Sequence, residues 1–391
     1  MFHLTTEELT EKKALHTTRE IYQQPSVWEE LAGDFIDNQE NLKSFLNSIF
    51  TKHERTRVIF TGAGTSAFIG DILVPELSKQ QLSHVQFESI PTTDIVSNPT
   101  EYFFENSPTI LVSFARSGNS PESVATVALG QELIEDFYQV VVTCNKEGEL
   151  ARNIQKDENS IVILTPERAN DQSLAMTSSF SSMMVAAYAL FTESHFTTQA
   201  SQLLASTGKK FFDSFSDKVK EIMQFDFNRI VYLGSGLLAQ LSHEAALKML
   251  ELTAGNVVAL HESSLGFRHG PKSILHDQSL VVLFMSQDDY TRKYDLDILR
   301  ELASAKSGMK IVALTEEEDE EVANLADWSI VVNPSSEGLK SDLQLGLIYI
   351  LFAQSLALNK SVQLGISPDN PSPDGAISRV VQGVTIHDYK K

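Results

Sequence analysis

Short apolar runs alternate with longer amphipathic segments over most of the chain. From Arg57, five runs rich in valine, isoleucine and leucine follow one another: VIFTG, VQFESI, TILVSF, VVVTCN and IVILTP. Helical patterns lie between some of them, over Phe68–Leu77 and over SPESVATVALGQELI. Because continuous apolar runs are typical of strands buried on both faces, this alternation predicts an α/β fold with a mostly parallel sheet flanked by helices.

The same order of elements recurs about 170 residues later. Landmarks in the two halves correspond at offsets of 172, 170, 170 and 168 residues, namely Gly62 with Gly234, Leu111 with Val281, Val141 with Ile311, and Pro166 with Pro334. Four landmarks in register indicate a duplicated domain. We therefore predict two tandem domains, 51–205 and 206–360, each a five-stranded sheet in a flavodoxin- or Rossmann-like three-layer arrangement.

Three segments lie outside the predicted sheets. Residues 1–50 carry the apolar spacing of an amphipathic helix, including Trp28, Leu31 and Phe35. The segment SQLLASTGKKFFDSFSDKVKEIMQ predicts a helix that connects the two domains. In the tail, 361–391, a cluster of proline and aspartate predicts a loop, and VVQGVTI predicts a short strand that ties the tail down. A disordered tail is the alternative.

Composition narrows the range of partners. The formal net charge of −21 argues against binding to nucleic acid or to anionic membranes. The start of the chain has no apolar core for a signal peptide, and the longest apolar runs, near Met183–Phe191 and Leu345–Ala353, are about half of a membrane span. The sole cysteine, Cys144, ends the run VVVTC and is interpreted as a buried strand residue. A cytoplasmic protein is expected.

The second half carries the groups suited to acid–base chemistry. Glu244, Lys248 and Glu251 are spaced at i, i+4 and i+7, so they fall within an arc of about 60° on one helix. Glu262, Arg268, His269 and Lys272 follow, and we expect these groups to converge. The alternative is an ordinary solvated salt-bridge stripe. His261 and His276 are interpreted as structural or surface residues.

The first half carries a loop suited to phosphate. Pro121 fits the first turn of a helix, so Ser117, Asn119 and Ser120 lie at its positive N-terminus, next to Arg116. Ser66 and Ser178 would add hydroxyl donors. Ser120 could instead be only an N-cap. Because the second half has acids at the corresponding place, SQDDYTRKYD, we expect the first half to hold phosphate and the second to supply acid–base groups.

A dinucleotide site is a further alternative. The turns GAGTSA and GSGLLA both fit G-x-G-x-x-A, and Glu88 follows the first at a distance suited to holding a ribose.

The motifs GAGTS, SFARSGNSPES and ALKMLEL…GFRHGP resemble the sugar isomerase (SIS) domain family, in a double arrangement similar to the isomerase half of glucosamine-6-phosphate synthase. The segments REIYQQPSVW, ESSLGFRHGPKS and RVVQGVTIH resemble the tagatose-6-phosphate ketose/aldose isomerase family of AgaS type. The resemblance implies Lys248 and Glu251 as the lysine and the proton-transferring glutamate, and His269 as the ring-opening histidine. It aligns Gly64-Thr65-Ser66 and residues 115–120 with phosphate-binding motifs. The related family builds its active sites across a dimer, and the resemblance therefore implies a homodimer or a higher oligomer.

The sequence departs from the synthase pattern at several places. Ala115 replaces a phosphate-binding serine and Arg116 replaces a glutamine, so we expect phosphate contacts to shift towards Arg116. The segment from the glutamate to the histidine is two residues longer, which affects the placement of Glu262. Arg379 is a weak match to the lysine with which the synthase tail covers its active site.

These residues and the resemblance lead to one expected function. We expect a deaminase/isomerase that converts galactosamine 6-phosphate to tagatose 6-phosphate and ammonia, without a metal or another cofactor. His269 would open the ring, Glu251 would move a proton from C2 to C1, and water would hydrolyse the resulting ketimine. The alternatives are a hexose 6-phosphate isomerase that releases no ammonia and a non-catalytic sugar-phosphate sensor.

Overall fold

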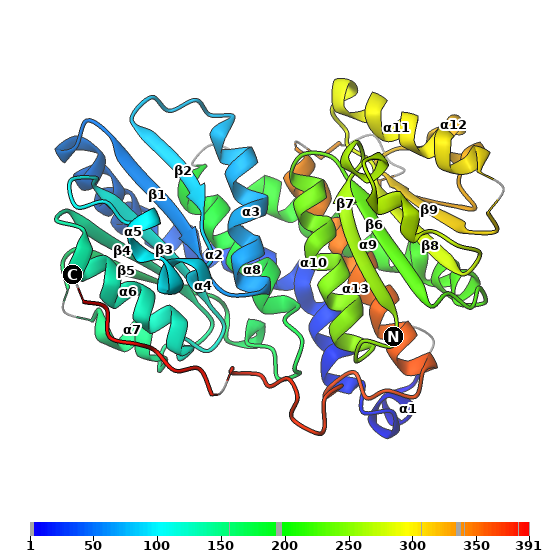
Figure 1. The fold of residues 1–391 in the computed structure, drawn as a ribbon, viewed down its shortest axis with the longest axis horizontal. Helices are drawn as coiled ribbons and strands as arrows, with labels where there is room; N and C mark the ends of the chain where they lie inside the picture. The colour runs from blue at the N-terminus through cyan, green and yellow to red at the C-terminus, as the bar shows by residue number, and fades with distance from the viewer. Residues whose placement is uncertain are drawn as a thin grey trace. The chain divides into compact units, whose positions relative to one another are not determined.

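The structure, a computed structural model, describes residues 4–155, 157–192, 198–305, 307–333, 338, 339, 341–381 and 383–390, with only the backbone at 36 and 37. The chain divides into two compact units, each holding one sheet (Figure 1). The first-sheet unit comprises Ser26–Asp171, Met176–Ser201 and Asp374–Lys391. The second-sheet unit comprises Met1–Pro25, Gln172–Ala175 and Gln202–Pro373.

The first sheet has the strand order β2-β1-β3-β4-β5, and every neighbouring pair is parallel. Its strands are β1 (Thr56–Thr61), β2 (Val85–Ser89), β3 (Thr109–Ala115), β4 (Phe137–Thr143) and β5 (Ser160–Leu164). Every residue of the central strand β3 is buried, as expected of a strand covered on both faces. The five apolar runs thus predicted this sheet, which is confirmed.

Helices cover both faces of the first sheet. On one face lie α3 (Thr65–Ser78) and α8 (Ser178–Phe191), where the ring of Phe191 meets that of Phe60 edge-on at a centroid distance of 5.5 Å. On the other face Ile59 and Leu111 pack with Val127. That face carries α4 (Thr92–Ser97), α5 (Pro99–Tyr102), α6 (Pro121–Leu133) and α7 (Glu149–Asn153), and the short turn η1 (Glu167–Ala169) follows β5.

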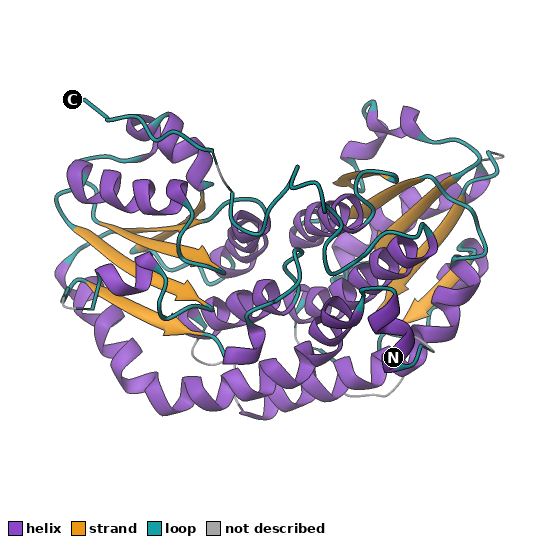
Figure 2. Ribbon diagram, turned by 90° about the horizontal axis from the view of Figure 1, so that it is seen from below, coloured by secondary structure: helices purple, strands orange, loops and turns teal. Residues whose placement is uncertain are grey.

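The second sheet has the strand order β10-β9-β8-β6-β7, again with parallel pairs. Figure 2 draws the strands of both sheets in orange. The strands of the second sheet are β6 (Arg229–Gly234), β7 (Val258–Ser263), β8 (Ser279–Phe284), β9 (Lys310–Thr315) and β10 (Trp328–Val331). Its helical segments are α10 (Leu237–Leu252), η2 (Gly266–Arg268), η3 (Pro271–Ile274), α11 (Asp289–Ser304), α12 (Glu320–Leu325) and α13 (Asp342–Gln363).

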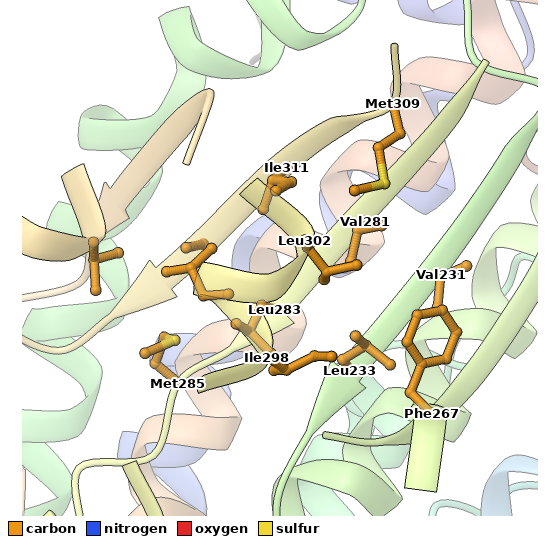
Figure 3. Packing of buried hydrophobic residues seen from close by; sticks show 13 residues of the cluster. Val231, Leu233, Phe267, Val281, Leu283, Met285, Ile298, Leu302, Met309 and Ile311 are labelled. Carbon is orange, nitrogen blue, oxygen red and sulfur yellow. The ribbon is translucent and has the colours of Figure 1, made fainter. Parts of the chain in front are cut away.

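Alternate residues of the second sheet face different helices. Val231 and Leu233 of β6 pack in one cluster with Phe267 of η2 and with Ile298 of α11 (Figure 3). Phe284 points to the opposite face, where it stacks on Tyr349 of α13 at a centroid distance of 5.4 Å. Gly346 of α13 lies against Leu241 of α10, since a Cβ there would be 3.4 Å from that side chain. Thus η2 and α11 cover one face, and α10 and α13 cover the other.

The duplication extends to backbone detail. Gly64 and Gly236 precede α3 and α10 with φ of 55° and 58° and the same ψ of −129°. The N–H groups of Thr92 and Ser264 donate to the carbonyls of Gly62 and Gly234, both at 2.8 Å. The two halves are therefore copies of one fold. The landmark Pro334 lies outside the described residues.

The segments outside the sheets are largely helical, as predicted. The N-terminal region forms α1 (Thr6–Glu11) and α2 (Leu15–Lys52), and the connecting segment forms α9 (Thr198–Ile222). Trp28 of α2 is buried, and its Nε1–H donates to Oγ of Ser181 at 2.9 Å. The apolar side of α2 is thus a core-facing side.

Within the described part of the chain, one helix, α13, is long and apolar enough by composition to cross a membrane, but 89% of its apolar window is buried inside the protein. The hydroxyl of Tyr349 contacts the carbonyls of Met285 and Leu314 at 2.8 and 2.9 Å. These contacts identify α13 as a core helix of the second-sheet unit.

The predicted strand in the tail is wrong. The described residues of VVQGVTI, 380, 381 and 383–386, form no strand, and Val381 is 50% exposed. Side-chain contacts hold the tail instead of a strand ladder: Arg379 bonds to the loop around Asp171, and Tyr389 packs on the first-sheet cluster.

Cys144 is buried, as predicted, but it is not a strand residue, because β4 ends one residue earlier, at Thr143. Burial raises the pKa of its thiol to about 12.

Candidate active site

The predicted phosphate loop lies at the carboxyl edge of the first sheet, directly after β3. Asn145 Nδ2 donates to the carbonyl of Ser117 at 2.8 Å, and Asn119 Oδ1 accepts from the N–H of Glu149 at 2.9 Å. Gly118 has a φ of 70° and lies so close to Gly148 that a Cβ would be 3.2 Å away. The loop is therefore held in one conformation. Ser120 is the N-cap residue of α6, but its side chain makes no capping hydrogen bond.

Arg116 and Arg379, both predicted to bind substrate, lie together. Arg116 is buried, and its Nη2 donates to the carbonyl oxygen of Arg379 at 3.0 Å. The side chain of Arg379 donates to Asn170 Oδ1 at 2.9 Å and to the carbonyl of Asp171. The tail thus reaches the predicted phosphate loop within the first-sheet unit.

The N-terminus of α8 already holds a carboxylate. Asp171 accepts from the backbone N–H groups of Thr177, Ser178 and Ser179 at 2.8, 3.0 and 2.9 Å. The predicted donor Ser178 is fully buried there. Ser66, at the start of α3, is buried with its Oγ 3.9 Å from the sulfur of Met176. Sequence reasoning missed Asp171, because a capping residue so far before its helix leaves no spacing signal.

Glu88 is not available to hold a ribose. Arg57 binds it with two hydrogen bonds, from Nε at 2.7 Å and from Nη2 at 2.8 Å. This bidentate ion pair argues against the dinucleotide alternative.

On α10, a buried ammonium lies between two carboxylates. Lys248 and Glu244 are both fully buried, whereas the side chain of Glu251 keeps 22% of its surface exposed. The Nζ of Lys248 donates to Glu251 Oε2 and is 3.5 Å from Glu244 Oε1. The alternative of a solvated salt-bridge stripe is therefore wrong for Glu244 and Lys248, because these two side chains face the interior.

Lys248 stays charged despite its burial. Desolvation lowers its pKa, but the charges of Glu244 and Glu251 outweigh this effect and raise the pKa above its ordinary value. A lysine whose pKa is raised is a poor base, so Lys248 is suited to orienting Glu251 and stabilising negative charge.

We expect Lys248→Met to lower the free energy of unfolding by about 3–5 kcal/mol, because it removes the cation from a buried ion pair. Urea unfolding followed by tryptophan fluorescence measures the change. Lys79→Met is the control, since that lysine, which binds Glu76, is itself exposed and should contribute less than about 1 kcal/mol. Equal losses in the two variants would contradict the structural role given to the buried pair.

Glu262, at the carboxyl end of β7, is held by its own loop. Its Oε1 accepts from the N–H of Ser263 at 2.7 Å, and Ser263 Oγ accepts from the N–H of Gly266 at 3.0 Å. A Cβ at Gly266 would lie 2.6 Å from Glu262 Oε1. A side chain at position 266 would therefore displace this carboxylate.

The following residues attach to α11. Arg268 Nε donates to Glu301 Oε2 at 2.6 Å, and Lys272 donates to the other oxygen of the same carboxylate. Both bonds lower the pKa of Glu301 below its ordinary value, and the bond from Lys272 has the larger effect. Between them His269 is exposed, and its ring has no hydrogen-bond partner among the described residues. Sequence reasoning missed Glu301, since only tertiary packing brings it to this loop.

The expected convergence of all these groups does not occur within one chain. Lys248 and Glu251 are on α10, which covers one face of the second sheet. The loop with Arg268 and His269 crosses from β7 to β8 on the opposite face, where Phe267 packs against α11. The reason is topological. The connection from β6 leads outwards to the edge strand β7, and the connection from β7 leads back past β6 to β8. Right-handed connections that run in opposite directions along a sheet lie on opposite faces of it.

The structure also shows a stacked histidine pair, of which the sequence analysis considered only His261, as a structural or surface residue. The rings of His243 on α10 and His261 on β7 lie 3.8 Å apart at 13°. Burial, and then the charge of His261, lowers the pKa of His243 to about 4. Among the described residues, no group of three or more histidine, cysteine, aspartate or glutamate side chains gathers as metal ligands would.

Comparison with known proteins gives consistent matches. The sequence pattern of the SIS domain matches residues 52–193 and 225–360. D-galactosamine-6-phosphate deaminase AgaS of Escherichia coli is 40% identical over 377 residues, 96% of each chain. The protein of that name from Shewanella sp. strain ANA-3 is 40% identical over 389 residues, 99% of this chain and 96% of that one. The crystal structure of tagatose-6-phosphate ketose/aldose isomerase from Escherichia coli superposes with a TM-score of 0.86 at 37% identity, covering 96% of this chain and 97% of that one.

Proposed function

The chain belongs to the SIS domain family and is a sugar-phosphate isomerase/deaminase, and from that premise we propose that it converts galactosamine 6-phosphate and water to tagatose 6-phosphate and ammonia. One observation carries the proposal. In a chain 40% identical to an AgaS deaminase over nearly its whole length, Glu251 contacts the buried Lys248.

Glu251 is proposed as the base. It takes the proton from C2 of the open-chain sugar while O1 gains a proton, and the C2–H electron pair forms the C1–C2 double bond of an enaminol. Glu251 then returns the proton to C1, which leaves a protonated imine at C2. Water adds to the imine, and ammonia leaves. The partial exposure of the Glu251 side chain lets it reach a ligand, whereas Lys248 beneath it is fully buried.

Lys248 and His269 are proposed in supporting roles. The hydrogen bond from Lys248 orients Glu251 for proton removal. His269 moves the proton between O5 and O1 in ring opening, a task suited to an imidazole. Because His269 and Glu251 are on opposite faces of the sheet, we propose that each site takes its histidine from a second copy of the chain, which requires at least a dimer.

Phosphate binding is assigned to Ser66, Arg116, Ser117 and Ser120, with Ser178 and Arg379 supporting their positions. Glu262 and Arg268 are assigned to the sugar, on the loop that also carries His269. The reducing cytosol is the proposed compartment, consistent with a single buried cysteine.

We expect Arg116→Gln to raise KM for the sugar phosphate by about 10- to 100-fold, since a hydrogen bond from a charged donor to the phosphate is lost. Steady-state kinetics measure the change. Arg168→Gln is the matched control, because that arginine is paired with Glu30 at the surface. An unchanged KM in Arg116→Gln would remove this residue from the phosphate site.

The test of the proposed function is a product assay on the purified chain. Galactosamine 6-phosphate should yield ammonia and tagatose 6-phosphate in equal amounts. Conversion of galactose 6-phosphate without any ammonia from the amino sugar would instead identify a simple isomerase. Binding of both sugars without product would identify a sensor.

A further inference from the structure

The crevice at the switch point of the second sheet contains a carboxylate of the chain itself. In open parallel sheets, ligands bind where consecutive connections leave neighbouring strands in opposite directions. In the first sheet this point is between β1 and β3, where the predicted phosphate loop lies. In the second sheet it is between β6 and β8, and there the fully buried Asp295 of α11 is found.

Three strand ends donate hydrogen bonds to this carboxylate. Ser235, after β6, donates its hydroxyl to Asp295 Oδ1 at 2.6 Å, and Ser264, after β7, donates its hydroxyl to the same oxygen at 2.5 Å. Ser286, after β8, donates its backbone N–H to Oδ2 at 2.9 Å. Two hydroxyls and one amide converging on one carboxylate are the kind of donor set that also binds an external oxyanion.

The first sheet has no such acid at the corresponding place. The helices α6 and α11 begin after corresponding N-caps, Ser120 and Asp288, which are 168 residues apart (288 − 120). By this alignment Asp295 corresponds to Val127, an apolar residue of the first-sheet cluster. The switch point of the second sheet thus holds a buried carboxylate, whereas the corresponding position of the first sheet is apolar.

We infer that Asp295 serves as a built-in anionic ligand of the second sheet, occupying a site that takes a small carboxylate or another oxyanion when Asp295 is removed. Through Ser264 this ligand fixes the start of the loop that carries His269, so Asp295 is a positioning residue. The inference does not depend on the proposed reaction, because its main test measures stability and not turnover.

The charge of the carboxylate is the point to be tested. Burial raises the pKa of Asp295, and the bonds from Ser235, Ser264 and Ser286 lower it again without cancelling that rise. Asp342, whose Oδ2 accepts from Ser286 Oγ at 2.6 Å, adds a second acid nearby and also favours the higher pKa. Two small molecules of similar shape, one anionic and one neutral, therefore test whether the Asp295 site favours an anion.

The experiment is chemical rescue of the full-length chain. Asp295→Ala should lower Tm by about 5–10 °C, since three hydrogen bonds are lost. Sodium formate should restore most of this loss in a saturable manner, whereas formamide and sodium chloride at equal concentrations should not. Asp297→Ala is the control, because Asp297 is an exposed residue of α11 that binds Arg300. The Tm of this variant should respond equally to formate and to chloride.

A second variant keeps the inference testable where Asp295→Ala does not fold. Asp295→Asn keeps the shape of the side chain but removes its charge. In one orientation its amide N–H group faces the N–H of Ser286, and in the other orientation one of the hydrogen bonds from the serine hydroxyls is lost. The variant should lower Tm and reduce kcat by about 10- to 100-fold with little change in KM, as expected of a displaced catalytic loop. Wild-type stability and kcat in Asp295→Asn, or rescue of Asp295→Ala by formamide as well as by formate, would overturn the inference.

Discussion

Glu251→Gln should lower kcat for ammonia release from galactosamine 6-phosphate by about 10²- to 10⁴-fold, the contribution expected of a general base. Glutamine has the size of glutamate but cannot accept the C2 proton. The variant should fold, because Lys248 keeps Glu244 as its second carboxylate neighbour at 3.5 Å. KM should change little, since the sugar is held mainly by groups other than Glu251. Coupled assay of ammonia, together with a denaturation curve, measures both effects.

The matched control for this prediction is Glu321→Gln. Glu321 is also a helical glutamate in an ion pair, but its partner Arg300 and the pair itself are exposed. The control should retain wild-type kcat. A Glu251→Gln enzyme with undiminished turnover would exclude Glu251 as the base. Loss of solvent exchange at C2 in the variant would further localise the defect to proton removal.

Mixing two inactive variants should restore activity. His269→Ala and Glu251→Gln are each expected to be almost inactive when alone. If each site combines Glu251 of one chain with His269 of another, a mixed dimer has one site with both residues intact and one site with neither. Random exchange between equal amounts should therefore recover about 25% of wild-type activity, because half of the dimers are mixed and each has one working site of two.

The control for the mixing experiment is a double variant that carries both substitutions, mixed with wild type. In those mixed dimers each site lacks one of the two residues, so activity should fall below that of wild type diluted with inert protein. If mixtures of the single variants stay inactive after proven subunit exchange, both residues act within one chain. The loop with His269 would then have to leave its position on α11.

Much of the fold follows from local patterns in the sequence. The apolar runs are predictive because strands buried on both faces need no polar alternation, and β3 is buried at every position. The offset of 172 between Gly62 and Gly234 finds the duplication, because both copies need a glycine turn before the helix. The same reasoning places Ser120 at a helix N-terminus, as the structure has it.

The parts that were not predicted depend on long-range packing. Helix periodicity grouped Glu244, Lys248 and Glu251 correctly but could not tell a buried stripe from a solvated one. Strand order decides on which face each connection runs, and no local pattern reports it, so the sequence left open whether His269 serves its own chain's site or a neighbour's. The tail failed as a predicted strand because side-chain contacts of Arg379 and Tyr389 replace backbone pairing there.

The burial of Cys144 has a practical consequence for these measurements. With a thiol pKa of about 12, only about one molecule in 10⁵ carries the reactive thiolate at pH 7. Maleimide dyes should therefore leave the native chain unlabelled. A cysteine introduced at an exposed position such as Asp277 would then be the sole point of attachment in an otherwise unmodified enzyme. Donor- and acceptor-labelled preparations made in this way report subunit exchange by energy transfer, independently of any turnover.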